Sequence, residues 1–340
     1  MKARDELGNL EAVIAHVSDL HFCDLFCNTE DRLSSVIGAA PHYYPLLAAL
    51  DACFCRIPTQ LQSRFALETK PRIDMVIATG DLTTTANPIA FEEVNNFLRG
   101  SKYVGVDGPK IGLEMGPNAL VVPGNHDTWF TRMGWQYWMR RIVDRSEAYE
   151  KYFPKCPDWN IRQFGGADFL FIGVNSNKGL RGLLNISRGR IDEAELADIA
   201  HRLVTYKDSS TRRVFTIILL HHHPYLPADM DEQELTKLLN AEEVLRALSS
   251  MHADMVLFGH RHESFEAMCP PPLSHGSSLL VSCAGSASQM GERKGNSFKI
   301  YLFFHQGIRI IKYTFDGCTR FNPVASFQFD YPNGSPFTQI

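Results

Sequence analysis

The strongest constraint in this sequence is a series of short apolar runs rich in Val, Ile, Leu and Phe. Each run has the length of a β-strand, and its apolar residues are consecutive, as in strands that are buried on both faces. Segments with the apolar spacing of helices lie between several of the runs. Strands that alternate with helices predict an α/β fold in which helices cover the sheets. The runs span residues 12–17, 75–79, 120–122, 169–174, 215–220, 255–258, 279–283 and 299–304.

Three segments between these runs are predicted to be helices. Asn87 and Pro88 begin the first helix, because Asn accepts hydrogen bonds from the free amides at a helix start and Pro suits the first helical position. Residues 187–206 and 231–250 have apolar residues at helical spacing and predict two more.

The chain, residues 1–340, is predicted to form a single domain, because no internal repeat or low-complexity linker divides it. Two apolar runs flank the pair Gln306-Gly307 and predict a C-terminal antiparallel β-hairpin at 298–315, so the sheet is expected to be mixed. The segment 22–72 mixes aromatic, Pro and Cys residues around one plausible helix. We interpret this segment as an insertion over the site.

Polar clusters follow five of the apolar runs directly. In open α/β sheets the carboxyl ends of the strands form the crevice that binds ligands, so these clusters are expected to converge on one site. The clusters are Ser18-Asp19-Leu20-His21, Gly80-Asp81, Pro123-Gly124-Asn125-His126-Asp127, His221-His222-His223-Pro224 and Gly259-His260-Arg261-His262.

The residue types in these clusters suit two transition-metal ions. If Asp19 and His21 lie on an extended segment, their side chains point the same way and can share a metal, and the same holds for His260 and His262. Imidazoles combined with carboxylates favour Mn, Fe, Zn, Co or Ni over Mg and Ca. Two divalent ions carry more positive charge than two carboxylates neutralise, so the centre stays positive and attracts an anion. Such a binuclear centre can promote displacement at phosphorus.

The ordered set of motifs resembles that of the calcineurin-like metallophosphoesterase superfamily. D-x-H, G-D, G-N-H-D, a histidine before a proline and G-H-x-H follow one another from Asp19 to His262. Each motif alone is weak, whereas the ordered set is specific. The pattern is most similar to the branch of class III cyclic nucleotide phosphodiesterases and glycerophosphodiesterases, although the long gap from His21 to Asp81 departs from that branch. The resemblance implies two packed mixed β-sheets flanked by helices.

The resemblance also implies a set of metal ligands. Among the three consecutive histidines, His222 is preferred because the ligand of this family usually stands two residues before a proline, here Pro224, and His221 is the second choice. The cofactors would be two divalent ions, Mn, Fe or Zn. The implied ligands are Asp19, His21 and His262 for the first ion, Asn125, His222 and His260 for the second, and Asp81 as the bridge between them.

Two further residues of the G-N-H-D motif have implied catalytic roles. A hydroxide that bridges the two metals would attack phosphorus. His126 would contact the phosphate and protonate the leaving oxygen, and Asp127 would orient its ring.

The same residues also have structural interpretations. Asp81 alone could cap a turn, Asn125 could be a turn residue, and the motif glycines could be ordinary loop glycines. All of these would have to coincide at five strand ends, which argues against them together. The isolated histidines, such as His16, are interpreted as structural.

The predicted activity is hydrolysis of a phosphate ester of small size, with a cyclic nucleotide or a glycerophosphodiester favoured. A phosphomonoesterase would need extra cations for the dianion, a Mn-dependent nuclease would need a groove for nucleic acid, and a non-catalytic scaffold of the same fold would have lost ligands. The formal net charge of -4 provides no basic field, so a nucleic-acid partner is not favoured. The oligomeric state is left open.

The expected location is the cytoplasm. No apolar stretch has the length of a membrane span, and no secretory segment is recognisable. The eight cysteines have neither the C-x-x-C spacing of a zinc site nor the density of a disulfide scaffold, so reduced thiols are expected.

Overall fold

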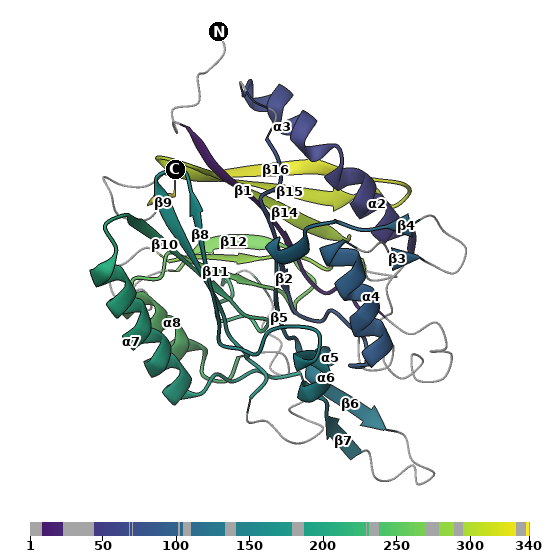
Figure 1. The fold of residues 1–340 in the computed structure, drawn as a ribbon, viewed down its shortest axis with the longest axis vertical. Coiled ribbons are helices and arrows are strands. Elements are labelled where there is room, and N and C mark those ends of the chain that lie inside the picture. The colour runs from purple at the N-terminus through teal and green to yellow at the C-terminus, as the bar shows by residue number, and fades with distance from the viewer. Residues whose placement is uncertain are drawn as a thin grey trace.

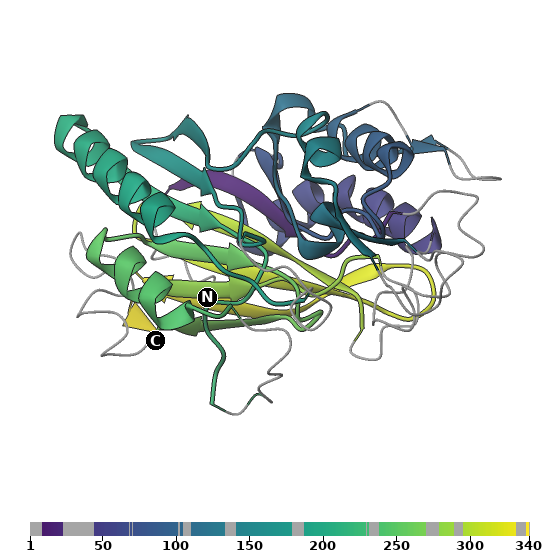
Figure 2. The same cartoon turned by 90° about the horizontal axis from the view of Figure 1, so that it is seen from below.

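Two β-sheets pack face to face, and helices cover the outer face of each sheet (Figure 1). The second view shows α7 and α8 on one side of the sandwich and α2 and α4 on the other (Figure 2). The predicted α/β sandwich of two mixed sheets is therefore confirmed. The computed structural model describes residues 9–22, 44–67, 69, 71–100, 103–104, 110–132, 141–178, 187–228, 230, 238–269, 279–288, 295–330 and 338–339.

The first sheet has seven strands in the order β17-β16-β15-β14-β1-β2-β5. β1, β2 and β5 are parallel to one another, and β14 pairs with β1 antiparallel. β14 and β15 form an antiparallel hairpin in which Phe304 lies opposite Gly307. The strands are β1 (Leu10–Val17), β2 (Met75–Thr79), β5 (Ala119–Val122), β14 (Ser297–Phe304), β15 (Gly307–Phe315), β16 (Phe321–Asp330) and β17 (Thr338–Gln339).

The second sheet has six strands in the order β12-β13-β11-β10-β9-β8. Its four central strands are parallel, and both edge strands are antiparallel to their neighbours. Its strands are β8 (Asp158–Phe164), β9 (Ala167–Gly173), β10 (Arg213–Leu219), β11 (Met255–Phe258), β12 (Phe265–Met268) and β13 (Leu280–Cys283). Two short ribbons pair β3 (Tyr103–Val104) with β4 (Lys110–Ile111) and β6 (Trp129–Arg132) with β7 (Arg141–Asp144).

The helices start where capping groups and tertiary contacts allow. The Asn87 side chain accepts a hydrogen bond of 2.9 Å from the Ile89 amide at the start of α4, as the sequence predicts. α8 begins at Ala241, and residues 231–237 of the predicted helix lie outside the described residues. The Asn240 side chain before α8 bonds the backbone of Ile191. The helices are α2 (Tyr44–Phe54), α3 (Ile57–Phe65), α4 (Pro88–Arg99), the 3-10 helix η1 (Gly116–Asn118), α5 (Asn125–Thr128), α6 (Ser146–Glu150), α7 (Glu193–Ser209) and α8 (Ala241–Ser250).

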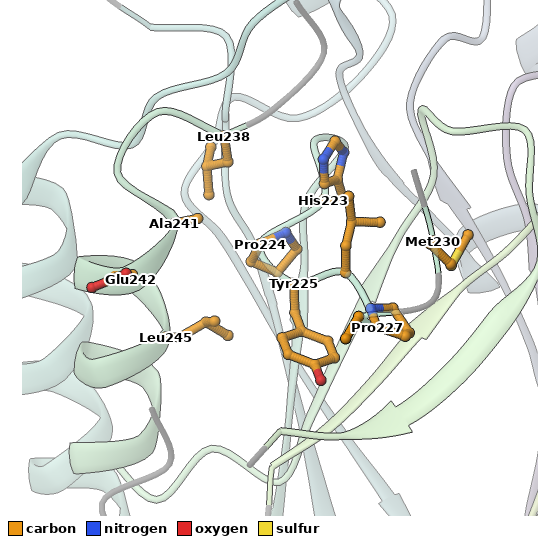
Figure 3. Close-up of a pocket in the computed structure, with 11 residues that line it drawn as sticks. His223, Pro224, Tyr225, Pro227, Met230, Leu238, Ala241, Glu242 and Leu245 are labelled. Carbon is orange, nitrogen blue, oxygen red and sulfur yellow. The ribbon is translucent and has the colours of Figure 1, made fainter. Parts of the chain in front are cut away.

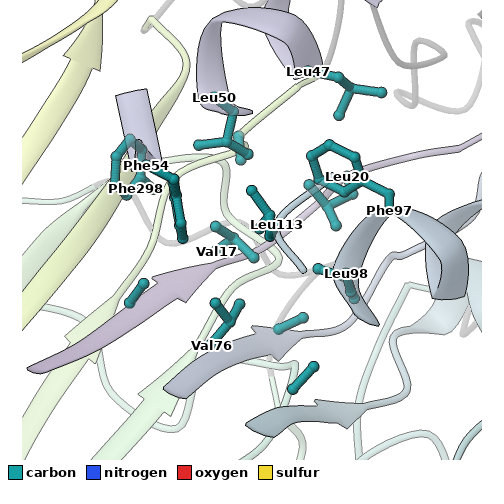
Figure 4. Packing of buried hydrophobic residues seen from close by; sticks show 14 of the residues in the cluster. Val17, Leu20, Leu47, Leu50, Phe54, Val76, Phe97, Leu98, Leu113 and Phe298 are labelled. Atoms are coloured by element: carbon teal, nitrogen blue, oxygen red, sulfur yellow. The ribbon is translucent and has the colours of Figure 1, made fainter. Parts of the chain in front are cut away.

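The continuous apolar runs are explained by burial on both faces of each sheet. In β1, Ala12 and Ile14 face the second sheet, whereas Val13 and Val17 face the helical layer of α2 and α4. In the centre of the sandwich the rings of Phe169 and Phe303 meet edge to face, with centroids 5.1 Å apart. Figure 4 shows the outer cluster, in which side chains of α2 and α4 cover β1 and β2. Three apolar layers thus hold the two sheets and their helices together: one lies between the sheets, and one lies under the helices on each side.

The described part of the predicted insertion is helical. α2 and α3 belong to the helical layer on the first sheet, and residues 23–43, 68 and 70 of the segment lie outside the described residues. The assignment of one domain and of an insertion at 22–72 stays a prediction. Among the described residues no helix is long and apolar enough to cross a membrane.

A buried ion pair joins the two sheets, with Lys299 on β14 of the first sheet and Glu266 on β12 of the second. The Lys299 ammonium, which is fully buried, contacts the Glu266 carboxylate and donates hydrogen bonds to the Phe265 carbonyl at 2.6 Å and to the Ser282 hydroxyl at 2.9 Å. Burial lowers the pKa of Lys299, and the nearby Glu266 opposes this effect. Each charge of this buried pair is therefore stabilised by the other.

Candidate metal centre

The five polar clusters of the sequence meet at the carboxyl ends of β1, β2, β5, β10 and β11. Backbone hydrogen bonds join strand ends within each sheet: the Asp19 amide donates to the Gly80 carbonyl at 3.1 Å, and the Gly259 amide donates to the His221 carbonyl at 3.1 Å. The His260 amide crosses between the sheets and donates to Asp19 Oδ2 at 3.1 Å. The loops after strands of both sheets are therefore adjacent, and the predicted convergence on one place is found.

Two groups of side chains come within the distance of metal ligands. In each group, one ligand atom per residue lies within 4.8 Å of the others. Within the groups, His262 Nε2 lies 3.3 Å from Asp19 Oδ1, and His221 Nε2 lies 3.3 Å from Asp81 Oδ2. We call them the first cluster, Asp19, His21 and His262, and the second cluster, Asp81, His221 and His260. The first cluster contains the three residues predicted for the first ion.

Asn125 adjoins the second cluster. Its side-chain oxygen lies 3.2 Å from His221 Nε2, and His260 Nδ1 lies 3.1 Å from the same nitrogen. The Nδ1 of His221 faces the Thr79 carbonyl at 2.7 Å, which directs Nε2 toward Asp81. Four side chains from four strand ends thus converge here.

His221, and not the predicted His222, belongs to the second cluster. His222 turns toward another loop, where its Nδ1 lies 2.8 Å from the Ser176 hydroxyl. Its ring still lies beside that of His260, with centroids 4.5 Å apart. Spacing from the proline favoured His222, but the direction of each ring after β10 is set by contacts with Thr79 and Ser176, which are distant in sequence.

Several ring nitrogens at the centre are buried and lack a hydrogen-bond partner among the described residues. They include both ring nitrogens of His21, and the Nε2 atoms of His222 and His260. A buried polar atom without a partner costs about 1–3 kcal/mol, so such a concentration indicates that a ligand completes the site. Imidazole, carboxylate and amide donors together suit transition-metal ions. The residues therefore fit the implied divalent ions.

The backbone at the centre is strained at the ligands themselves. φ is +53° at Asp19, +50° at His21, +48° at Asp81, +72° at His260 and +53° at His262. Residues with a β-carbon rarely adopt such left-handed values, which cost on the order of 1–3 kcal/mol each and cluster at functional sites. The prediction that the D-x-H and H-x-H pairs lie on extended segments is wrong. The paired side chains converge because left-handed residues turn the chain after the strands have ended.

Two motif glycines are required by close packing around the carboxylates. A β-carbon on Gly124 would lie 2.2 Å from Asp81 Oδ1. One on Gly259 would lie 1.8 Å from the Ser18 hydroxyl and 2.7 Å from Asp19 Oδ2. These glycines therefore allow the loops to approach the metal-binding carboxylates, which an ordinary loop glycine need not do.

Charges at the centre are balanced between carboxylates and histidines. Burial opposes ionisation of Asp19 and Asp81, but the adjacent histidines, His262 for the former and His221 for the latter, hold the pKa of each carboxyl below its usual value. Burial would lower the pKa of His221, yet Asp81 raises it to about 9. Burial lowers the pKa of His21 to about 3, so its ring is neutral. The carboxylates are thus ionised and ready to bind cations.

His126 lies at the edge of the centre and is partly exposed. Its ring is 5.3 Å from that of His21, measured between centroids. Its Nδ1 lies 2.9 Å from the Thr84 carbonyl, which can only accept a hydrogen bond, so Nδ1 carries a proton and Nε2 is the nitrogen left for a ligand. Its backbone amide donates to Asp81 Oδ1 at 2.9 Å.

The prediction that Asp127 orients the His126 ring is wrong. The Asp127 carboxylate is buried and accepts hydrogen bonds from the amides of Leu82 at 3.0 Å, Thr83 at 2.8 Å and Gly124 at 2.9 Å. It joins the loop after β2 to the loop after β5 and so places Asp81 and Asn125 indirectly. The sequence analysis also missed Thr79 and Thr84, whose backbone carbonyls give no signal in the side-chain pattern.

His16, interpreted as structural, lies outside both clusters. Its ring nitrogens lie 3.1 Å from the Tyr301 hydroxyl and 2.8 Å from the Thr79 hydroxyl. Both polar atoms of this buried ring thus have partners within the protein, in contrast to those of His21.

Comparison with known proteins gives one matching family and several solved structures of low sequence identity. The model of the calcineurin-like phosphoesterase family matches residues 12–264. The structure of PhoD superposes with a TM-score of 0.54 at 10% identity, over 98% of this chain and 72% of that chain. GAP50, the anchor in the inner membrane complex of Plasmodium, gives a TM-score of 0.48 at 12% identity, over 93% and 90% of the two chains. At such identity the likeness to PhoD supports the fold alone. No curated protein matches the chain in sequence.

Proposed function

Since the chain belongs to the calcineurin-like phosphoesterase family, we propose that it is a metal-dependent hydrolase of a small phosphodiester. The observation that carries this proposal is the meeting of two ligand clusters, with Asn125 beside the second, at the ends of five strands. A cyclic nucleotide or a glycerophosphodiester is the favoured substrate class. We also propose that the substrate is not a long nucleic acid, because the net charge of -4 offers no general attraction to a polyanion.

Two divalent ions, Mn, Fe or Zn, would be held by the two clusters. The first cluster would hold one ion, and His221, His260 and Asn125 would hold the other. Asp81 is proposed to serve both, because its charge acts on His21 as well as on His221. When bound, such ions activate water and neutralise negative charge on the phosphate oxygens.

The protein orients its ligands through backbone groups. The Thr79 carbonyl holds the Nδ1 proton of His221, so the Nε2 lone pair faces the second cluster. Each carboxylate is held in place by an amide of another motif: the His260 amide donates to Asp19 Oδ2 at 3.1 Å, and the His126 amide donates to Asp81 Oδ1 at 2.9 Å. These bonds leave the remaining lone pairs of both carboxylates for cations.

His126 is proposed as the general acid. The Thr84 carbonyl accepts from Nδ1 and fixes the ring, so a proton on Nε2 is the one available to a leaving oxygen. The ring is partly exposed, and its centroid lies 5.3 Å from that of His21, so it stands at the edge of the first cluster. A general acid in this position contributes about 10²–10⁴ to the rate.

A diester is favoured over a monoester by the charges near the motifs. A dianionic monoester needs cations beyond the two metals, but Arg261, the arginine within the last motif, lies 3.5 Å from the Glu263 carboxylate. That pairing reduces the positive charge that Arg261 offers to a phosphate.

The test is hydrolysis of bis-p-nitrophenyl phosphate, p-nitrophenyl phosphate and DNA by the Mn²⁺-loaded protein, with Asp81→Ala as the metal-site control. We expect the wild type to cleave the diester faster and Asp81→Ala to lose both metal and activity. Faster cleavage of the monoester would replace the proposal by a phosphomonoesterase, and cleavage of DNA alone would replace it by a nuclease. A loaded protein that cleaves none of these would point to a non-catalytic scaffold.

We further propose a cytoplasmic location. Cys53, Cys156, Cys269 and Cys283 are buried free thiols in the structure. Unpaired cysteines are usual for proteins of a reducing compartment.

A further inference from the structure

A cavity lies beside the metal centre, where the chain continues after His221. It has a volume of about 400 Å³, within the range of about 300–1,000 Å³ that is usual for small-molecule sites. One wall comes from the loop at residues 223–228, and the other comes from the first turns of α8 (Figure 3). The cavity therefore lies between the loop that follows β10 and helix α8.

His223 joins this cavity to the metal centre. It lines the cavity, and its ring is nearly parallel to that of His260, at 20° with centroids 6.2 Å apart. His223 is 3% exposed, and neither of its ring nitrogens has a hydrogen-bond partner among the described residues. A neutral imidazole offers one donor and one acceptor, and burying both unused is costly. A ligand in the cavity that offers an acceptor and a donor would satisfy them.

The remaining walls are mostly apolar. Leu238 and Leu245 are each 1% exposed and are part of the core between α7, α8 and the second sheet, so they form a firm base. Tyr225 and Pro227 of the loop stand opposite Leu245 and Ala241 of the helix (Figure 3). Glu242 is the charged residue among those that line the cavity; it is exposed and pairs with Arg246 at 2.9 Å. An otherwise apolar slot with one histidine at its inner end suits a flat ring that carries polar atoms on its edge.

We propose that this cavity binds the base of a nucleotide substrate, with His223 hydrogen-bonded to the edge of the base. The inference rests on the proposed phosphodiesterase function, whose substrate class it narrows. A glycerol group would leave the apolar walls uncovered, and an acyl chain would leave His223 without a partner. A nucleotide has an apolar ring face, a polar ring edge and a phosphate that can reach the adjacent clusters.

Binding without turnover tests the cavity independently of catalysis. The dissociation constants of adenosine 5′-monophosphate and ribose 5-phosphate for the Mn²⁺-loaded protein are compared by calorimetry, because the two ligands share a phosphate and differ in the base. We expect the nucleotide to bind at least about tenfold more tightly, the factor that one net hydrogen bond can provide. Equal affinities would overturn the proposal.

Two variants and a matched control locate the preference. Ala241→Phe places a ring in the cavity from a partly exposed wall, and it should abolish the preference while ribose 5-phosphate binds as before. Glu243→Phe adds the same ring at an exposed position of the same helix outside the lining, and it should keep the preference. A preference that survives Ala241→Phe would contradict the proposal.

His223→Phe keeps the ring shape and removes both nitrogens. We expect it to lose about tenfold in nucleotide affinity. Its melting temperature without ligand should not fall, because the replaced nitrogens have no partners among the described residues. This variant carries the test if Ala241→Phe fails to fold. A preference for the nucleotide without hydrolysis of any phosphodiester would refute the proposed function and support base binding in the cavity. Hydrolysis of a phosphodiester without such a preference would support the proposed function and refute base binding in the cavity.

Discussion

Metal binding at the second cluster is expected to release a proton from His221. Without metal, Asp81 raises the pKa of His221 to about 9, whereas an imidazole must be neutral to bind an ion. Below that pKa one proton competes with the metal, so the apparent dissociation constant falls about tenfold for each unit of rising pH. Between about pH 6.5 and pH 8 the affinity for Mn²⁺ should therefore increase about 30-fold.

Calorimetric titration with Mn²⁺ measures both the affinity and the protons released, if it is repeated in buffers with different enthalpies of ionisation. The control is His222→Asn, which should keep the pH dependence because His222 lies outside the second cluster. His221→Asn should lose the tight site and its proton release together. An affinity independent of pH, or a dependence that disappears in His222→Asn and persists in His221→Asn, would refute this reasoning.

Three further changes test other parts of the structure. Gly259→Ala places a carbon 2.7 Å from Asp19 Oδ2, so metal content measured by mass spectrometry should fall below that of the wild type, and unchanged content would contradict the packing argument. His126→Ala should keep its metals and lose about 10²–10⁴ in kcat on a diester with a poor leaving group, and wild-type turnover would exclude the role of His126 as the acid. Lys299→Met leaves the Glu266 carboxylate buried without its cation and should lower the free energy of unfolding in urea by about 3–5 kcal/mol, whereas an unchanged midpoint would show that the pair is not coupled.

Much of the fold was predictable because most of its strands are buried on both faces. The runs at 75–79 and 255–258 coincide with β2 and β11, and 120–122 lies within β5. β8 and β12 were missed because they are edge strands with partly exposed side chains, and neither contains a continuous apolar run. Their pairing depends on the neighbouring strand rather than on their own pattern.

The candidate site was predictable in residue type and place, but not in the direction of each side chain. The order of motifs identified Asp19, His21 and His262, which the structure brings together. The choice between His221 and His222 depends on backbone and hydroxyl partners more than 40 residues away in sequence, which spacing does not show. The strained left-handed backbone at the ligands likewise arises from tertiary contacts.

The central claim is that the two clusters hold two metal ions at the ends of the five strands. The most direct measurement is anomalous X-ray diffraction from crystals of the Mn²⁺-loaded protein. We expect two anomalous peaks, one between Asp19, His21 and His262 and the other between Asp81, Asn125, His221 and His260. No peak at these clusters after loading, or peaks bound only elsewhere on the protein, would contradict the account.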